Sequence, residues 1–348
     1  MDARSGPRTD RWDARAWALA LAACLLALLA AGCRERGAPA TATPERTPPA
    51  DLPAVRRFEV TPGRTIAYWG NADLAAARGR SRAVIVVHGD ARNADEYFAF
   101  ARTAADLARS DALIIAPRFV TEDDEGRAPS DLIWTDATWK DGATPVLRDA
   151  VSSFGVMDRL LAALAEETSL RDIVIVGHSA GGQFVQRYAA AARLPDGPHV
   201  RFVVANPSSY VYLDDRRPDA GRFDEPSRST ERGCSRYDRY KYGLERLPEP
   251  LDAIGADTLR TQYRARDVTI LLGALDRSDE DNLDRGCEAR LQGAQRYERG
   301  VLFYQYVQAL FPPVGDHRLR IVPGVGHDAA AMLRSEAALD AVFDASAR

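Results

Sequence analysis

One serine of this chain lies in a sequence pattern that suits nucleophilic catalysis. Ser179 is the central residue of a G-x-S-x-G motif at 177–181, which follows an apolar run at 173–176 and precedes a segment rich in alanine. Where a strand turns sharply into a helix, the central hydroxyl projects above the sheet, and only small neighbours fit the turn. A serine at a helix N-terminus also lies beside free N–H groups, which favour a developing oxyanion. We predict that Ser179 is a nucleophile; the alternative is a tight turn without chemistry.

A histidine near the end of the chain is placed to act as the base. A serine hydroxyl is a weak nucleophile and needs a partner whose pKa lies near 7, which imidazole supplies. Among the five histidines, His327 follows an apolar stretch at 319–322 and a glycine-rich loop at 323–326, and it precedes a helical pattern. That position is the carboxyl edge of the predicted sheet, where Ser179 also lies. We expect His327 to be the base, with an ordinary surface-loop histidine as the alternative.

The elements that would position these residues alternate between strand and helix. Short apolar runs predict strands at 83–87, 113–116, 173–176, 202–205 and 268–272, with a weaker one at 319–322 and an entry hairpin at 57–60 and 65–69. Helical patterns occupy 94–108, 149–167, 183–193, 292–310 and 329–345. This alternation predicts an α/β fold with a mainly parallel central sheet and helices on both faces. The segment at about 213–266 fits no strand–helix unit, so we expect an insertion over the carboxyl edge.

Over residues 83–348 these features resemble the α/β-hydrolase family. In that family the nucleophile, the acid and the histidine follow one another along the chain, which implies the triad Ser179, Asp276 and His327. Asp276 follows an apolar run at 270–275, so it also leaves a strand at the carboxyl edge, and it would orient the imidazole. The alternative is an acidic loop that is merely solvated; its acids lack the ligand spacing of a calcium-binding loop. The same loop offers further acids: Asp279, Glu280, Asp281 and Asp284.

An oxyanion hole needs two backbone donors. One should be the N–H of Ala180, the residue after the nucleophile. The family resemblance assigns the other to Asp90, which follows His-Gly after the strand at 83–87, and Gly89 is the alternative donor. A carboxylate at this position must turn away from the anion, and we expect it to turn toward Arg92.

The stretches 86–94 and 177–182 are similar to secreted polyester depolymerases and feruloyl esterases. Those enzymes usually carry Leu in place of His178 and Cys in place of Asp90. The resemblance implies hydrolysis of a small or polymeric ester through an acyl-enzyme. The alternatives are a serine peptidase on the same fold and an exported binding lipoprotein without turnover. Five aromatic residues could line an acyl or aryl pocket or belong to the core: Phe119, Trp134, Trp139, Tyr210 and Tyr212.

The N-terminus has the features of an export signal. Four arginines precede an apolar run at 16–31, which is shorter than the roughly 20 residues that span a membrane. The run ends in Leu-Ala-Ala-Gly-Cys, which resembles a bacterial lipobox and implies a lipid on Cys33. We therefore expect a lipoprotein signal at 1–33, a flexible Pro/Ala/Thr-rich tether at 34–54, and a hydrolase domain at 55–348 in a periplasmic or outer-membrane lipoprotein. The alternatives are an uncleaved anchor helix and a plain cleaved signal.

The remaining cysteines and the composition agree with an exported globular protein. Cys234 and Cys287 form an even pair outside the signal, which predicts a disulfide in an oxidising compartment, or else two buried thiols. Hydrophobic residues make up 46% and charged residues 28% of the 348 positions, an ordinary globular balance. The net charge of -4 and the absence of a basic stripe argue against nucleic acid. No Cys/His cluster has metal-ligand spacing, so we expect neither metal nor cofactor.

Overall fold

The computed structural model describes residues 52–74, 79–146, 151–226, 234–280, 282–312 and 315–344. The chain divides into two units, Met1–Thr47 and Pro48–Arg348, and the described residues all belong to the second. The expected signal, Cys33 and most of the expected tether therefore lie outside the described residues. Within the described ranges no helix has both the length and the apolar character needed to span a bilayer.

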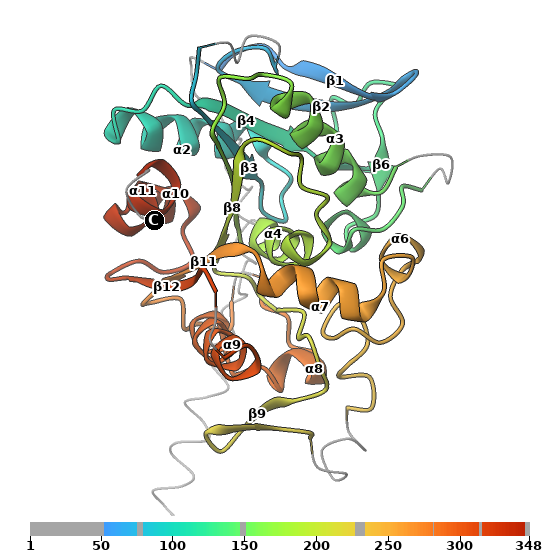
Figure 1. Cartoon of the computed structure of the whole chain (residues 1–348), viewed down its shortest axis with the longest axis vertical. Coiled ribbons are helices and arrows are strands. Elements are labelled where there is room, and N and C mark those ends of the chain that lie inside the picture. Colours follow the sequence, from blue (N-terminus) through green and yellow to red (C-terminus); the bar gives the residue numbers. More distant parts are fainter. Residues whose placement is uncertain are drawn as a thin grey trace, which may run out of the picture. The chain divides into compact units, whose positions relative to one another are not determined.

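An eight-stranded sheet forms the centre of the second unit (Figure 1). Its strands are β1 (Arg56–Thr61), β2 (Arg64–Gly70), β3 (Arg82–Val87), β4 (Leu113–Arg118), β7 (Asp172–His178), β8 (His199–Ala205), β11 (Asp267–Gly273) and β12 (His317–Val322). They are ordered β1-β2-β4-β3-β7-β8-β11-β12. The β1–β2 and β2–β4 pairs are antiparallel and all the others are parallel. The predicted fold class is therefore confirmed.

Helices cover both faces of this sheet because every inner strand carries apolar side chains on both sides. All residues of β3, β7 and β11 are buried. One core packs against α2 (Ala94–Leu107), α10 (Ala329–Arg334) and α11 (Glu336–Phe343). The other packs against α3 (Ser153–Ala165), α4 (Ala180–Ala191), α7 (Ala256–Arg264) and α9 (Arg296–Leu310). Figure 1 shows the two groups of helices on opposite sides of the strands.

Capping side chains explain two differences from the predicted helix bounds. The pattern at 329–345 divides into α10 and α11 because Ser335 accepts a hydrogen bond from the N–H of Ala338 and begins a new helix. Helix α9 begins at Arg296 rather than at 292, since the side chain of Gln295 accepts from the N–H of Glu298. In both cases a polar side chain accepts a hydrogen bond from an unpaired N–H of the first helical turn. The hydrophobic pattern of the sequence does not show such a cap.

The segment expected to be an insertion is only partly one. Its first part holds the short pair β9 (Arg217–Asp219) and β10 (Arg222–Asp224), then α6 (Glu249–Asp252). Its last part is α7, which packs on α4 and leads directly into β11. The expectation that all of 213–266 departs from strand–helix alternation is therefore wrong for α7. Its polar exposed face concealed the buried Leu259 and Tyr263 in the sequence pattern.

Short elements complete the described part. They are β5 (Val120–Thr121), β6 (Ile133–Trp134), the 3-10 helix η2 (Thr138–Asp141) and α8 (Cys287–Arg290). The loop that contains η2 and the insertion both contribute side chains near the start of α4, where the candidate site lies.

Candidate active site

Ser179 lies in a strained turn between β7 and α4. Its backbone has φ 58° and ψ −119°, a left-handed conformation that non-glycine residues rarely adopt. The turn is tightly packed against neighbouring backbone: a Cβ at Gly177 would lie 2.3 Å from the carbonyl oxygen of Gly181, and one at Gly181 would lie 2.3 Å from that of Val87. The Ser179 N–H donates to the carbonyl of Ala205 at 3.0 Å, which continues the pairing of β7 with β8. The glycines of the motif are therefore required by space.

The structure brings the three predicted catalytic side chains together. His327 Nε2 lies 3.0 Å from Ser179 Oγ, and His327 Nδ1 lies 2.7 Å from Asp276 Oδ2. With Nδ1 protonated and donating to the carboxylate, Nε2 is free to accept the serine proton. These residues are 148 and 51 positions apart, and each follows a strand of the parallel sheet. This is the geometry of a nucleophile, a base and an orienting acid.

Asp276 is held through both its side chain and its backbone. Its carboxylate is fully buried, and its carbonyl accepts from the N–H of Tyr297. The buried guanidinium of Arg296 lies 3.9 Å from the second carboxylate oxygen. Among the described alternatives, Asp279 faces Arg285 at 3.6 Å and Asp284 bonds elsewhere; Asp281 lies outside the described residues. Of the described acids in this loop, Asp276 is the one within hydrogen-bond distance of His327.

A second imidazole packs against that of His327. The ring centroids of His178 and His327 are 4.6 Å apart. Burial lowers the pKa of His178 well below its usual value, and the nearby His327 and Arg296 lower it further, so His178 is neutral. The side chain of Asn206 adjoins this pair: its Nδ2 lies 3.4 Å from His178 Nε2, and its Oδ1 accepts from the N–H of Gly273 at 2.9 Å. His178 and Asn206 therefore stabilise the surroundings of His327 without adding charge.

The loop after β3 lies beside the start of α4. Asp90 and Ala180 both border the space in front of Ser179. As the first residue of a helix, Ala180 has no acceptor for its N–H within that helix. The expectation that the Asp90 carboxylate turns toward Arg92 is wrong: the carboxylate pairs with Lys140 Nζ at 3.0 Å, while Arg92 Nη1 donates to the Asp90 carbonyl.

Arg92 forms its ion pairs with two other acids. Its guanidinium pairs with Asp124 and Asp136, each at 2.7 Å. His88 supports the loop from beneath: its Nδ1–H donates to the carbonyl of Gly89, and its Nε2 accepts from the N–H of Phe119. Burial lowers the pKa of His88 to about 4, so both bonds are made by the neutral ring.

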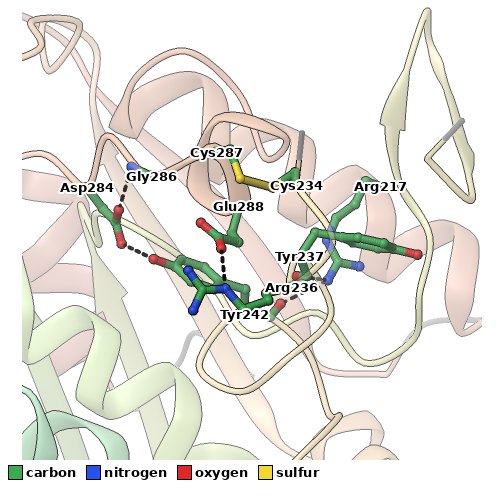
Figure 2. The surroundings of a disulfide bond; sticks show 9 residues. All are labelled: Arg217, Cys234, Arg236, Tyr237, Tyr242, Asp284, Gly286, Cys287 and Glu288. Atoms are coloured by element: carbon green, nitrogen blue, oxygen red, sulfur yellow. Dashed lines mark hydrogen bonds and ion pairs between the residues drawn. A yellow bond between two sulfur atoms is a disulfide. The ribbon is translucent and has the colours of Figure 1, made fainter. Parts of the chain in front are cut away.

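The predicted disulfide is present between Cys234 and Cys287, whose Cα atoms are 5.6 Å apart. It joins the insertion to the loop that follows Asp276. Figure 2 shows the cystine beside the ion pair of Arg236 with Glu288 and beside Asp284, which bonds to Tyr242 and to the N–H of Gly286. Cys234, Cys287 and Glu288 are the only described residues grouped closely enough to hold a metal, and there the sulfurs are joined to each other.

Comparison with solved structures identifies the fold family. The poly(3-hydroxybutyrate) depolymerase LpqC from Bordetella parapertussis is 26% identical, with a TM-score of 0.59, and the match covers 82% of this chain and 89% of that one. Poly(aspartic acid) hydrolase-1 from Sphingomonas sp. KT-1 is 25% identical, with a TM-score of 0.58, over 83% of this chain and 98% of that one. The protein has the α/β-hydrolase fold. No protein-family model matches the chain, and no curated protein does.

The pocket of this hydrolase in front of Ser179 is small and polar. It has a volume of about 240 Å³. Its lining residues are Asp90, Lys140, Ser179, Ala180, Gln183, Ser208, Lys241, Tyr242, Asn282 and Asp284. The five aromatic residues considered for this role are not among them; all five are buried in the core on the α3–α4 side of the sheet. Phe119 stacks there on Trp139, with ring centroids 6.0 Å apart, and Tyr210 stacks on Phe303 at 4.4 Å.

Sequence reasoning did not identify Lys140 and Lys241 as pocket residues. Neither belongs to a motif, and each is brought to the pocket by a loop far from Ser179 in the chain. A signal was present in the composition, however. The chain has 46 basic residues, and these two are its only lysines. In this α/β-hydrolase, both ammonium groups lie at the site.

Proposed function

We propose that this hydrolase cleaves carboxylic esters through an acyl-enzyme formed on Ser179. The observation that carries the proposal is the continuous contact from Ser179 Oγ to His327 Nε2 at 3.0 Å and from His327 Nδ1 to Asp276 at 2.7 Å. A serine becomes a useful nucleophile at neutral pH only beside such a base. The buried acid keeps the imidazole in the required tautomer and stabilises its cationic form.

The reaction proceeds in two halves. Ser179 Oγ attacks the ester carbonyl while His327 takes its proton, and the N–H groups of Ala180 and Asp90 stabilise the oxyanion. The tetrahedral intermediate collapses as His327 returns the proton to the departing alcohol, which leaves an acyl group on Ser179. Water then attacks the acyl-enzyme with His327 again as base, and the acid product is released. Every proton is returned, and Ser179 is regenerated.

Labelling with a fluorophosphonate tests the nucleophile. The probe should modify Ser179, located by digestion and mass spectrometry, and Ser179→Ala should abolish both the labelling and the turnover of p-nitrophenyl esters. Ser209, which is buried and bonded to Arg187 and Gln183, serves as a matched control in the form Ser209→Ala. Labelling that persists in Ser179→Ala would refute the assignment. A protein that is neither labelled nor active would instead favour the binding lipoprotein.

Amide hydrolysis is the second candidate, because the same geometry can protonate the departing alcohol of an ester or the departing amine of an amide. Of the two similar structures, one is named for a polyester and the other for poly(aspartic acid), whose repeating bond is an amide. A panel of p-nitrophenyl esters against aminoacyl and prolyl p-nitroanilides separates the candidates. We expect kcat/KM for the esters to exceed that for the anilides; the reverse order would make the protein a peptidase.

We also propose that the protein is exported and lipidated on Cys33. The Cys234–Cys287 disulfide supports an oxidising compartment, in which such bonds persist. Expression with labelled palmitate should give a labelled protein in the membrane fraction. Cys33→Ala should lose the label, with Cys24→Ala as the matched control inside the apolar run. An unlabelled wild-type protein would exclude the lipid but not export.

A further inference from the structure

The pocket contains an ammonium group that the proposed chemistry does not use. We infer that Lys241 binds a carboxylate of the substrate, so that the substrates of this hydrolase are acidic esters. The inference rests on the proposed function and specifies the substrate class of the same site. It starts from the placement of the two lysines of the chain at one small pocket.

Lys241 is held in place by Asp284, whose carboxylate oxygens already accept other hydrogen bonds. Its Nζ lies 3.1 Å from Asp284, and that carboxylate also accepts from the Tyr242 hydroxyl at 2.8 Å and from the N–H of Gly286 at 3.0 Å. Lys241 and these hydrogen bonds lower the pKa of Asp284 against the opposing effect of its burial. Asp284 therefore acts as an ionised anchor for the ammonium. Figure 2 shows its bonds to Tyr242 and to Gly286.

The ammonium retains donors for a ligand. A lysine has three N–H donors, and Asp284 is the one carboxylate paired with Lys241 among the described residues. The Lys241 side chain is 28% exposed, whereas that of Asp284 is only 15% exposed. The more accessible member of the pair is therefore the cation, and it borders the pocket that contains Ser179.

A buried guanidinium behind the pocket wall adds to the positive potential. Arg299 is fully buried and donates to the carbonyl oxygens of Ser208 and Gly293, and Ser208 lines the pocket. Within the described ranges no carboxylate lies within ion-pair distance of Arg299. Burial lowers its pKa to about 10, so it remains charged at neutral pH. This charge is shielded little by solvent.

The balance of charge favours a negative group on the substrate. Lys140 is compensated by Asp90 and Lys241 by Asp284, so the two pairs cancel. The Arg299 guanidinium, which the carboxylates of Asp284 and Glu298 partly offset, adds positive potential behind the wall, and this favours an anionic group on the substrate. Lys140 is less suited to bind substrate, because its Nζ also donates to the carbonyl of Asp136 and its side chain is only 13% exposed.

A matched pair of substrates tests the inference. 4-Nitrophenyl hydrogen adipate has a free carboxylate; in methyl 4-nitrophenyl adipate this carboxylate is methylated, so the negative charge is absent. We expect the purified protein to favour the acid in kcat/KM by about tenfold, mostly through KM, as for one partly exposed charge-assisted hydrogen bond. Lys241→Met should reduce this preference about tenfold, and Lys241→Arg should retain most of it. Added salt should weaken it in the wild-type protein.

Arg285→Met is the control for a general loss of positive charge. Arg285 lies on the same loop, is exposed, and lines a different pocket beside the β9–β10 pair. Its replacement should leave the preference unchanged.

Two results would overturn the inference alone: a wild-type protein that cleaves both esters equally, or a preference that persists in Lys241→Met. If Lys241→Met does not fold, a preference in the wild-type protein that salt leaves unchanged overturns it instead. If neither ester is cleaved and the fluorophosphonate leaves Ser179 unmodified, the proposed function fails and the inference fails with it. Labelling of Ser179 together with turnover of the methyl ester distinguishes the two failures.

Discussion

Lys140 is expected to protect the oxyanion site from the negative charge of Asp90. The proposed donor at residue 90 carries a carboxylate, which would repel a developing oxyanion held by the N–H of the same residue. Lys140 Nζ lies 3.0 Å from that carboxylate and neutralises it. Replacing Lys140 with methionine keeps most of the side-chain volume and removes the charge. The variant should therefore stabilise the transition state less while binding a neutral ester as before.

The size of the effect follows from Coulomb's law. An oxyanion bound to the Asp90 N–H would lie roughly 5 Å from the Asp90 carboxylate, which gives about 3 kcal/mol at an effective dielectric constant of about 20 and about 0.8 kcal/mol in water. The Asp90 side chain is 43% exposed, so solvent screens part of the repulsion. An intermediate value of about 1.4 kcal/mol corresponds to about a tenfold decrease in kcat.

A double-mutant cycle on a neutral p-nitrophenyl ester is the appropriate assay. Lys140→Met should lower kcat about tenfold with little change in KM, and adding Asp90→Asn to it should restore most of the loss. Lys140→Arg keeps the charge and should remain near wild type. The reasoning is refuted if Lys140→Met retains full kcat, or if Asp90→Asn fails to rescue it, because the loss would then come from packing or from the bond to the Asp136 carbonyl.

Three further predictions concern the acid, the disulfide and the buried His88. Asp276→Asn should lower kcat about 10⁴-fold on a neutral ester, whereas Asp279→Asn in the same loop should leave it unchanged. Cys234→Ser with Cys287→Ser should lower the free energy of unfolding in urea by roughly 4 kcal/mol, since the bond closes a loop of 53 residues. Stability should fall as the pH drops from about 6.5 toward 4, because the unfolded chain then binds a proton that folded His88 does not; its pKa of about 4 makes this worth about 3 kcal/mol.

Each of these predictions has an outcome that would contradict it. Equal kcat in the two aspartate variants would move the role of acid to another residue. Reduction of the wild-type protein should reproduce the urea midpoint of the serine variant, and an unchanged midpoint would show that the bond adds no stability. Thermal melts between pH 7 and 4.5 measure the third effect. A Tm that stays constant or rises on acidification would mean that His88 is protonated in the folded protein or that opposing carboxylates dominate.

Local sequence patterns were sufficient to predict the sheet and the turn that holds Ser179. The centre of strand β7, residues 173–176, is apolar because it is buried on both faces. Gly177 and Gly181 are required because a Cβ at either would lie under 3 Å from neighbouring backbone. Both properties depend on near neighbours in the chain, so they leave a pattern in it. The position of His327 could also be predicted, because it follows from the order of strand, loop and helix.

Other features depended on contacts between distant segments. Which acid of the 276–284 loop faces His327 is decided by how that loop packs on α9, where Tyr297 bonds to the Asp276 carbonyl. The Asp90 carboxylate pairs with Lys140, 50 positions away, and the nearby Arg92 pairs with Asp124. The five aromatic residues are buried because their large apolar surfaces favour the core, as those of the inner strands do. No local sequence pattern distinguishes an aromatic residue of the core from one that lines a pocket.

The sequence alone therefore determined the fold class, the nucleophile turn and the edge of the sheet at which chemistry is expected. The tertiary structure decided which charged groups meet there: Asp276 with His327, Lys140 with Asp90, and Lys241 with Asp284. The physical reason is range. Backbone geometry and burial periodicity act over a few residues, whereas an ion pair forms wherever folding brings two side chains within about 4 Å, whatever their separation in the chain.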